Sequence, residues 1–193
     1  MKHQERLLGA VQIANSILLR NKVNEFPIRL DPICRKEGIR LFSYREGWEL
    51  IKKMGLEKST EDNPGFCIGK LIFYDDTEPL PELRFTVAHE LGHIMCGHTL
   101  LRWRDPDKKL KAIPSAEREA SAFAISLLAP LSVLYRAGIR SSEEIADICD
   151  ISITYARSRC KTLSTLEVCG AVPQNDGIVN NFMPYIVKRF LKF

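Results

Sequence analysis

Two histidines and a glutamate lie close together in a chain that holds only four histidines. His89, Glu90 and His93 form the pattern H-E-x-x-H. On a helix, residues four apart share a face, so both imidazoles can direct a ring nitrogen at one point. Zinc binds such neutral nitrogens, and in catalytic sites it keeps one position open for water. Glu90 lies about 100° around the helix from His89, where it can reach that water without binding the metal. The pattern therefore predicts metal-assisted hydrolysis.

A catalytic zinc needs a third protein ligand, and the residues that follow His93 offer two candidates, Cys96 and His98. The metzincin pattern H-E-x-x-H-x-x-G-x-x-H would need glycine at position 96 and histidine at position 99, but the chain has Cys96 and Thr99 there. Gly97 is expected to end the helix, which leaves His98 as a helix-terminal residue. A ligand from another helix is therefore favoured over both.

The helix expected over residues 115–128 carries two glutamates that are two positions apart. Residues at this spacing project to nearly opposite sides, so Glu117 and Glu119 cannot both bind one metal ion. Glu117 lies nearer the edge of the apolar stripe of this helix, and Glu119 is expected to lie in solvent. The stripe consists of Ala116, Ala120, Phe123, Ala124 and Leu127. Helix geometry favours Glu117 as the third ligand and leaves Glu119 as the alternative.

The elements that would position these residues predict a mainly helical α+β protein with a small β-sheet. The motif helix is expected over residues 81–96, after a loop marked by Pro79 and Pro81. Short apolar or alternating runs predict strands at 39–44, 66–69 and 71–74. Further helices are expected at 4–20, 32–37, 46–53, 131–137, 142–149 and 152–163.

Three other stretches are less regular in their pattern. The many charges of residues 102–111 predict an exposed loop or a frayed helix. Residues 168–180 read as irregular or short β structure. From Pro184 to the end, the chain has the pattern of a short basic helix that packs on the rest of the protein rather than on a membrane.

Composition limits the class of protein. The 193 residues include 45% hydrophobic and 27% charged residues, and this balance excludes a disordered, collagen-like or coiled-coil chain. The net charge of +4 permits nucleic-acid contact without requiring it. The six cysteines contain no C-x-x-C pair, so we expect reduced, mostly buried thiols. Residues 4–20 have helical spacing that favours an amphipathic helix over a secretory signal, and no run approaches the about 18 apolar residues of a membrane span. A cytoplasmic protein is therefore expected.

Residues 142–163 have a pattern that resembles a helix-turn-helix. Arg157, Arg159 and Lys161 would give the second helix a basic edge. The first helix and the turn carry acids that would repel phosphate, namely Glu143, Glu144, Asp147 and Asp150. The basic edge makes a DNA-binding regulator with a non-catalytic or structural metal site the alternative function, and these acids argue against it. The favoured reading is a helix pair that packs on an enzyme and could offer a docking surface to its substrate.

Two segments together resemble the ImmA/IrrE family of metallo-endopeptidases. The first is RFTVAHELGH at residues 84–93, and the second runs from EREASAFA at 117–124 to LLAP at 127–130. A weaker resemblance extends over about residues 25–165. It implies a zincin-like, gluzincin-type metallopeptidase core at residues 1–130. A helical, helix-turn-helix-like segment and the C-terminal tail would follow at 131–193, packed on that core.

The resemblance also implies which residues form the site. In this family the ligands are the two histidines of the motif and a glutamate thirteen residues before the proline that closes the second segment. Counting back from Pro130 reaches Glu117. The ligands of a Zn²⁺ ion would therefore be His89, His93 and Glu117, and Glu90 would be the catalytic general base.

The family's substrates are helix-turn-helix repressors of mobile elements or stress responses, which its members cleave and inactivate in the cytoplasm. The implied partner is therefore such a repressor protein, with direct DNA binding less favoured and no membrane involved. Ser121 stands where the family usually has Asn or Asp, a group that would orient a ligand histidine through its other ring nitrogen. Candidates for stabilising the oxyanion are Tyr74, Arg84 and His98.

Overall fold

The computed structural model describes residues 2–98, 114–171 and 175–191, so the expected polar loop at 102–111 lies outside the described residues. The strands are β1 (Arg40–Ser43), β2 (Gly65–Ile68) and β3 (Leu71–Tyr74). The helices are α1 (Lys2–Arg20), α2 (Leu30–Lys36), α3 (Tyr44–Lys53), a short 3-10 helix η1 (Glu57–Thr60), α4 (Leu80–Met95), α6 (Pro114–Leu128), α7 (Leu131–Arg136), α8 (Ser142–Cys149), α9 (Ile153–Val168) and α10 (Asp176–Phe190).

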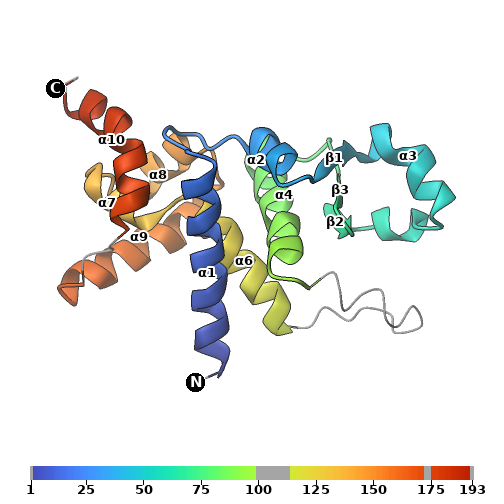
Figure 1. Ribbon diagram of the computed structural model, residues 1–193, viewed down its shortest axis with the longest axis horizontal. Coiled ribbons are helices and arrows are strands. Elements are labelled where there is room, and N and C mark those ends of the chain that lie inside the picture. The colour runs from blue at the N-terminus through green and yellow to red at the C-terminus, as the bar shows by residue number, and fades with distance from the viewer. Residues whose placement is uncertain (1, 99–113, 172–174, 192–193) are drawn as a thin grey trace.

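The molecule is elongated, and its elements fall into three groups along the long axis (Figure 1). The sheet and α3 lie at one end, α1, α4 and α6 lie in the middle, and α7 to α10 lie at the other end. The mainly helical α+β class with a small mixed sheet is confirmed. None of the described helices combines the length and the apolar character needed to cross a membrane.

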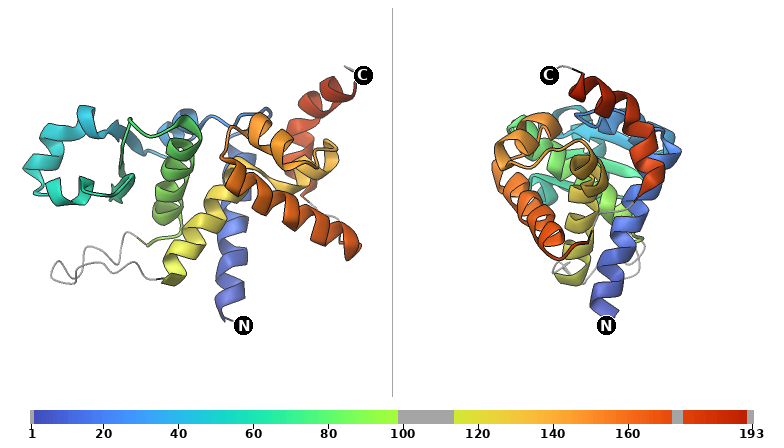
Figure 2. Two further views of the ribbon diagram at one scale, coloured as in Figure 1. Left: turned by 180° about the vertical axis from the view of Figure 1, so that it is seen from behind. Right: turned by 90° about the vertical axis from the view of Figure 1, so that its left-hand side faces the viewer.

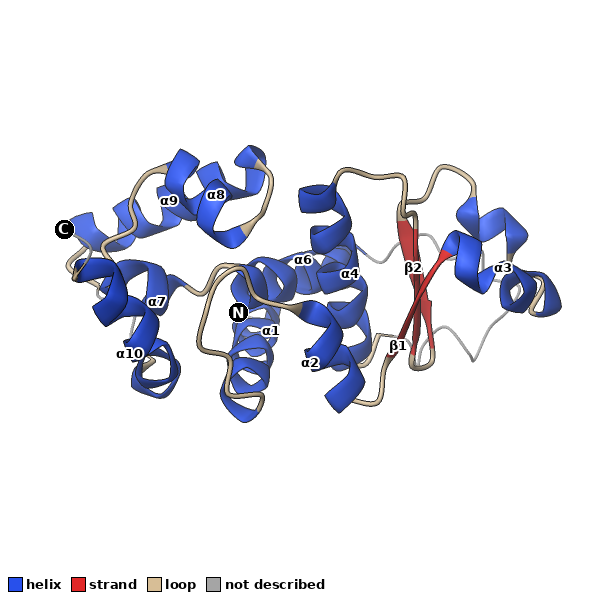
Figure 3. Cartoon of the chain, turned by 90° about the horizontal axis from the view of Figure 1, so that it is seen from above, coloured by secondary structure: helices blue, strands red, loops and turns tan. Residues whose placement is uncertain are grey.

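The sheet has the strand order β1-β3-β2, with β1 parallel and β2 antiparallel to β3. The two central positions of β3 face opposite sides. Ile72 is buried in the main core, whereas Phe73 is buried in a second cluster with Ile51 of α3 and Phe66 of β2. Seen from above, the strands separate α4 from α3 (Figure 3). The sheet thus lies between α4 and α3, with β2 at one of its edges.

Helices α1, α4 and α6 form the centre of the main core. Both views in Figure 2 show α1 lying against α6, and Ala14, Leu91 and Phe123 are fully buried, one from each helix. Helices α4 and α6 approach closely because Gly92 has no side chain. A Cβ atom at this position would lie 3.0 Å from the carbonyl oxygen of Ala120. This contact fixes the separation of the two helices that carry the candidate ligands.

The helix pair α8–α9 is present as expected, but its basic edge is not. Arg159 is 8% exposed. Its guanidinium donates to the carbonyl oxygen of Ala129 at 2.6 Å and to Ser126 Oγ at 3.4 Å. The expectation that Arg159 faces outward is therefore wrong, because the end of α6 leaves carbonyl groups that a long donor from α9 can satisfy.

The C-terminal region is more helical than its sequence pattern indicates. Helix α9 continues to Val168, and α10 begins at Asp176 rather than near Pro184, which lies inside it. The side chain of Asn175 caps α10 by accepting from the backbone N–H of Ile178. Burial of one face of α10 outweighs the backbone hydrogen bond that proline removes. That face consists of Ile178, Val179, Phe182 and Ile186.

Candidate metal centre

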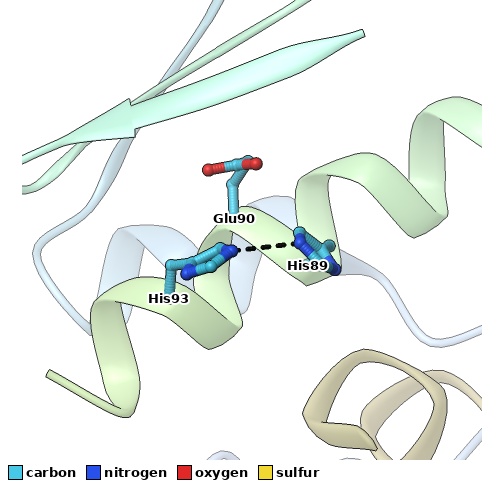
Figure 4. A group of neighbouring side chains, drawn as sticks. All are labelled: His89, Glu90 and His93. Carbon is cyan, nitrogen blue, oxygen red and sulfur yellow. Dashed lines mark hydrogen bonds between the residues drawn. The ribbon is translucent and has the colours of Figure 1, made fainter. Parts of the chain in front are cut away.

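Helix α4 places the two motif histidines one turn apart in the middle of the protein. The helix begins after Pro79, with Pro81 in its first turn, and it ends at Met95, with Cys96 as its C-cap. The Nε2 atoms of His89 and His93 lie 3.0 Å apart (Figure 4). The side chain of His93 is only 4% exposed. Two ring nitrogens, one from the buried His93 and one from the partly buried His89, are therefore held side by side, as expected from the spacing of the motif.

Helix α6 brings Glu117 to the same point. Its Oε2 atom lies 3.1 Å from Nε2 of His89 and 3.4 Å from Nε2 of His93. His89 Nε2, His93 Nε2 and Glu117 Oε2 form a nearly equilateral triangle, here named the ligand triangle. Ligand atoms around a tetrahedral zinc ion at about 2.0–2.1 Å are separated by about 3.3–3.4 Å. The triangle thus has about the size that a zinc ion requires.

The environment keeps the Glu117 carboxyl ionised. Burial acts to raise the pKa of Glu117, but the electrostatic and hydrogen-bonding contributions of His93 and His89 outweigh it and lower the pKa. A carboxylate and two imidazoles are a donor set that zinc uses in catalytic sites. The chemistry of these residues therefore fits a divalent metal of this kind.

Glu90 belongs to the same group but points in a different direction. It is 7% exposed, and the candidate ligand atoms of His89, Glu90 and His93 all lie within 4.8 Å of one another. In Figure 4 its carboxylate projects towards the neighbouring strand, away from the dashed contact between the imidazoles. This position is close enough for contact through one water molecule, as a general base requires.

Ser121 and Arg84 also have clear roles in the structure. Ser121, one turn after Glu117 on α6, has its Oγ atom 3.3 Å from Nδ1 of His89. Arg84 is an oxyanion candidate from the sequence, but its guanidinium donates to the backbone carbonyls of Ile28, Cys149 and Asp150. It therefore connects α4 to the end of α8 and is not directed at the candidate metal centre.

His98 is separated from the ligand triangle, and Cys96 is poorly suited to bind a metal. His98 contacts Nδ1 of His93, on the opposite edge of the ring from the triangle. Burial raises the pKa of the Cys96 thiol to about 11, which disfavours the thiolate form that binds metal. Burial also raises the pKa of Tyr74, at the end of β3.

The environment of Glu119, on α6, differs from the one expected. The expectation that Glu119 lies in solvent is wrong: it is 8% exposed, and its Oε2 atom lies 3.2 Å from Nε2 of His98. A glycine followed by a histidine at the end of the motif helix is the sequence signal that could have revealed this contact, because glycine there allows the chain to turn back.

An acidic cavity of about 600 Å³ opens beside the motif helix. Phe85 lines this cavity one turn before His89, and the two rings are 6.1 Å apart. Phe85 also stacks on Tyr155 of α9, with ring centroids 3.6 Å apart. The carboxylates that line the cavity belong to Asp62, Asp75, Glu78 and Glu82. A substrate segment with positive charge would be favoured in this space.

Comparison with known proteins agrees with this geometry. The sequence profile of the IrrE N-terminal-like domain, Peptidase_M78, matches residues 34–156, well over half of the chain. The matched region includes both α4 and α6. Searches of curated proteins and of solved structures found no match. The chain belongs to the IrrE N-terminal-like domain family, and it is a metallopeptidase of that family with a candidate H-E-x-x-H site at His89, Glu90 and His93.

Proposed function

We propose that the protein is a zinc-dependent endopeptidase that cleaves a helix-turn-helix transcriptional repressor. Cleavage would relieve repression of a mobile element or of a stress response. The observation that carries the catalytic part is the triangle of His89 Nε2, His93 Nε2 and Glu117 Oε2, with edges of 3.0–3.4 Å. These three residues are the proposed ligands, and Glu90 is the proposed catalytic base.

Each residue of the site has a separate task. A zinc ion at this point would polarise the scissile carbonyl and make a water molecule more acidic. Glu90 takes the proton of the attacking water and then passes it to the departing amine. Ser121 accepts the Nδ1–H of His89, which keeps Nε2 of that ring free of a proton and directed into the triangle.

The acidic cavity supports the proposed class of substrate. A helix-turn-helix protein has a basic surface because it contacts phosphates. Such a surface is complementary to a space lined by Asp62, Asp75, Glu78 and Glu82. A basic segment bound beside Phe85 would lie next to the ligand triangle.

The reaction would take place in the cytoplasm. None of the six cysteines, all of which lie in the described residues, forms a disulfide, and three of them, Cys34, Cys67 and Cys149, are buried. Burial raises the pKa of both the Cys34 and the Cys149 thiols to about 12. Such thiols act as small apolar core residues rather than as reactive groups.

The test uses the full-length protein loaded with one equivalent of Zn²⁺ and a helix-turn-helix repressor encoded beside it. We expect the repressor to be cut, a chelator to stop the reaction, and added Zn²⁺ to restore it. Glu90→Gln should bind Zn²⁺ normally but lower the rate of cleavage by about 10²–10⁴-fold. The charge-matched control Glu49→Gln, at an exposed position of α3, should cleave at the parent rate. Undiminished proteolysis by Glu90→Gln would contradict the proposed mechanism.

Direct DNA binding is the alternative function, and the structure offers it less support. Arg159 is engaged inside the protein, so the basic edge of α9 loses one of its three members. The alternative would be favoured if the purified protein bound duplex DNA with a steep dependence on salt concentration and held no zinc.

A further inference from the structure

Three polar side chains, those of His93, His98 and Glu119, form a continuous line of contacts that begins at Nδ1 of His93. The Nδ1 atom of His93 lies 3.1 Å from Nδ1 of His98, and Nε2 of His98 lies 3.2 Å from Oε2 of Glu119. The side chains are 4%, 12% and 11% exposed, respectively. This line points away from the ligand triangle, which involves the other nitrogen of His93. His98 therefore contacts His93 on the side away from the triangle, and Glu119 contacts His98; neither contact involves the His93 nitrogen proposed to bind the metal.

The end of α4 creates this arrangement. Gly97 has a φ angle of +77°, in the left-handed region that favours glycine. The N–H of Gly97 donates to the carbonyl of Ile94, and the N–H of His98 donates to the carbonyl of His93. These two bonds define a Schellman motif, which places the residue after the glycine against the last turn of the helix. In many proteins that contact is apolar, whereas here it joins two imidazoles.

The hydrogen-bond chemistry of the line is consistent from one end to the other. A metal ion at Nε2 of His93 needs a lone pair there, so the ring must carry its proton on Nδ1. This N–H can donate to Nδ1 of His98, provided that the latter is unprotonated. His98 then carries its proton on Nε2, which is the atom that faces the carboxylate of Glu119. Every donor in the line thus has an acceptor.

A further contact connects the line to the first helix. The guanidinium of Arg6, on α1, lies 3.8 Å from Oε1 of Glu119. Glu119 therefore lies between a cation on one side and the N–H of His98 on the other. Because α1 packs along α6, the carboxylate is held from two elements. This environment explains how a glutamate can be buried two positions from the proposed ligand Glu117.

We propose that His98 and Glu119 are positioning residues that tune the metal site through His93. They fix the tautomer and orientation of the His93 ring, and the negative charge of Glu119, passed through His98, makes Nε2 a stronger donor towards a divalent cation. This inference rests on the proposed metal site at His89, His93 and Glu117. It assigns a role to two residues that touch neither the metal position nor the substrate cavity.

The experiment measures the affinity of the full-length protein for Zn²⁺ by competition with a chromogenic chelator. His98→Leu removes both links of the line and should weaken Zn²⁺ binding by about 10–100-fold. His98→Asn places an amide oxygen near the position of Nδ1, so it keeps the link to His93 but loses the link to Glu119, and its loss should be smaller. Glu119→Gln should also give a smaller loss, because the amide oxygen still accepts a hydrogen bond while the charge is gone.

Three comparisons separate tuning of the metal site from a general effect on folding. The double variant His98→Leu/Glu119→Gln should bind Zn²⁺ no more weakly than His98→Leu alone, since the two residues act in series. Glu57→Gln removes one exposed carboxylate elsewhere and should leave the affinity unchanged. The thermal midpoint of the metal-free protein should not distinguish His98→Asn from His98→Leu, whereas Zn²⁺ affinity should.

Some outcomes would overturn this inference. If folded His98→Leu and Glu119→Gln proteins bind Zn²⁺ within twofold of the parent, the two residues do not tune the site. If His98→Leu does not fold, the near-isosteric Glu119→Gln decides the question by the same criterion. Failure of the parent protein to bind one equivalent of Zn²⁺ would instead reject the proposed function, and this inference with it.

Discussion

Helices α4 and α6 direct polar side chains towards one another. In the α8–α9 pair, the buried polar side chain, Arg159 of α9, is instead directed into the rest of the protein. Across the α4–α6 pair, His89 and Glu117 meet at 3.1 Å. In the α8–α9 pair, the long side chain of Arg159 instead reaches the carbonyl of Ala129 at the end of α6. Burial lowers the pKa of Arg159 to about 10, so it keeps its charge at neutral pH.

The two pairs are joined rather than separate. Arg84 of α4 donates to the carbonyls of Cys149 and Asp150, where α8 ends. Phe85 of α4 stacks on Tyr155 of α9. The helix pair with the sequence pattern of a DNA-binding motif thus braces the motif helix of a metallopeptidase. The comparison teaches that the charges of a helix identify a binding face only when their burial is known.

The largest expected difference between the pairs comes from replacing a glutamate by glutamine, once in the first turn of α6 and once in the first turn of α8. Glu117→Gln removes the anionic oxygen of the ligand triangle. It should weaken Zn²⁺ binding by about 10²-fold or more and lower cleavage to a similar extent. Glu143→Gln changes an exposed carboxylate of α8 and should affect neither quantity. Zn²⁺ titration and a cleavage assay measure both. Normal affinity in Glu117→Gln would remove Glu117 from the ligand set.

A second comparison lies within α9, where one arginine is buried and the other is exposed. Arg159→Met keeps most of the side-chain volume but leaves the Ala129 carbonyl without its charged donor. We expect the free energy of unfolding to fall by about 2–3 kcal/mol. Arg157→Met should change it by less than about 0.5 kcal/mol. Urea denaturation measures both values, and equal effects would mean that Arg159 is not a structural anchor.

The sequence predicted the candidate site where local geometry determines it. The spacing of His89 and His93 requires only a helix, and the face of α6 together with the family pattern pointed to Glu117. The burial of Glu119 and Arg159 could not be predicted in this way. Glu119 is buried because His98 turns back at Gly97 and Arg6 approaches from α1. Arg159 is buried because carbonyl groups at the end of α6 need a donor. Both depend on contacts between elements that lie far apart in the sequence.

The same distinction holds for the fold. The strands and the motif helices appear close to their expected positions because their periodicity is local. The start of α10 was misplaced because Pro184 reads locally as a helix start, whereas the burial of Ile178 and Phe182 extends the helix on its N-terminal side.

The smallest expected effect tests how closely α4 and α6 must approach. Gly92→Ala would place a Cβ atom 3.0 Å from the Ala120 carbonyl oxygen, which belongs to the backbone and cannot move alone. Alanine favours the helix by about 1 kcal/mol, but crowding costs about 1–3 kcal/mol. We expect a net loss of about 1 kcal/mol in unfolding free energy and weaker Zn²⁺ binding, because α6 carries Glu117 away from α4. Gly9→Ala, on α1, where nothing beyond the local backbone of the helix lies within 4 Å of an added Cβ, should instead stabilise the protein. If both variants were stabilised and bound Zn²⁺ equally, the close approach would not be needed to form the site.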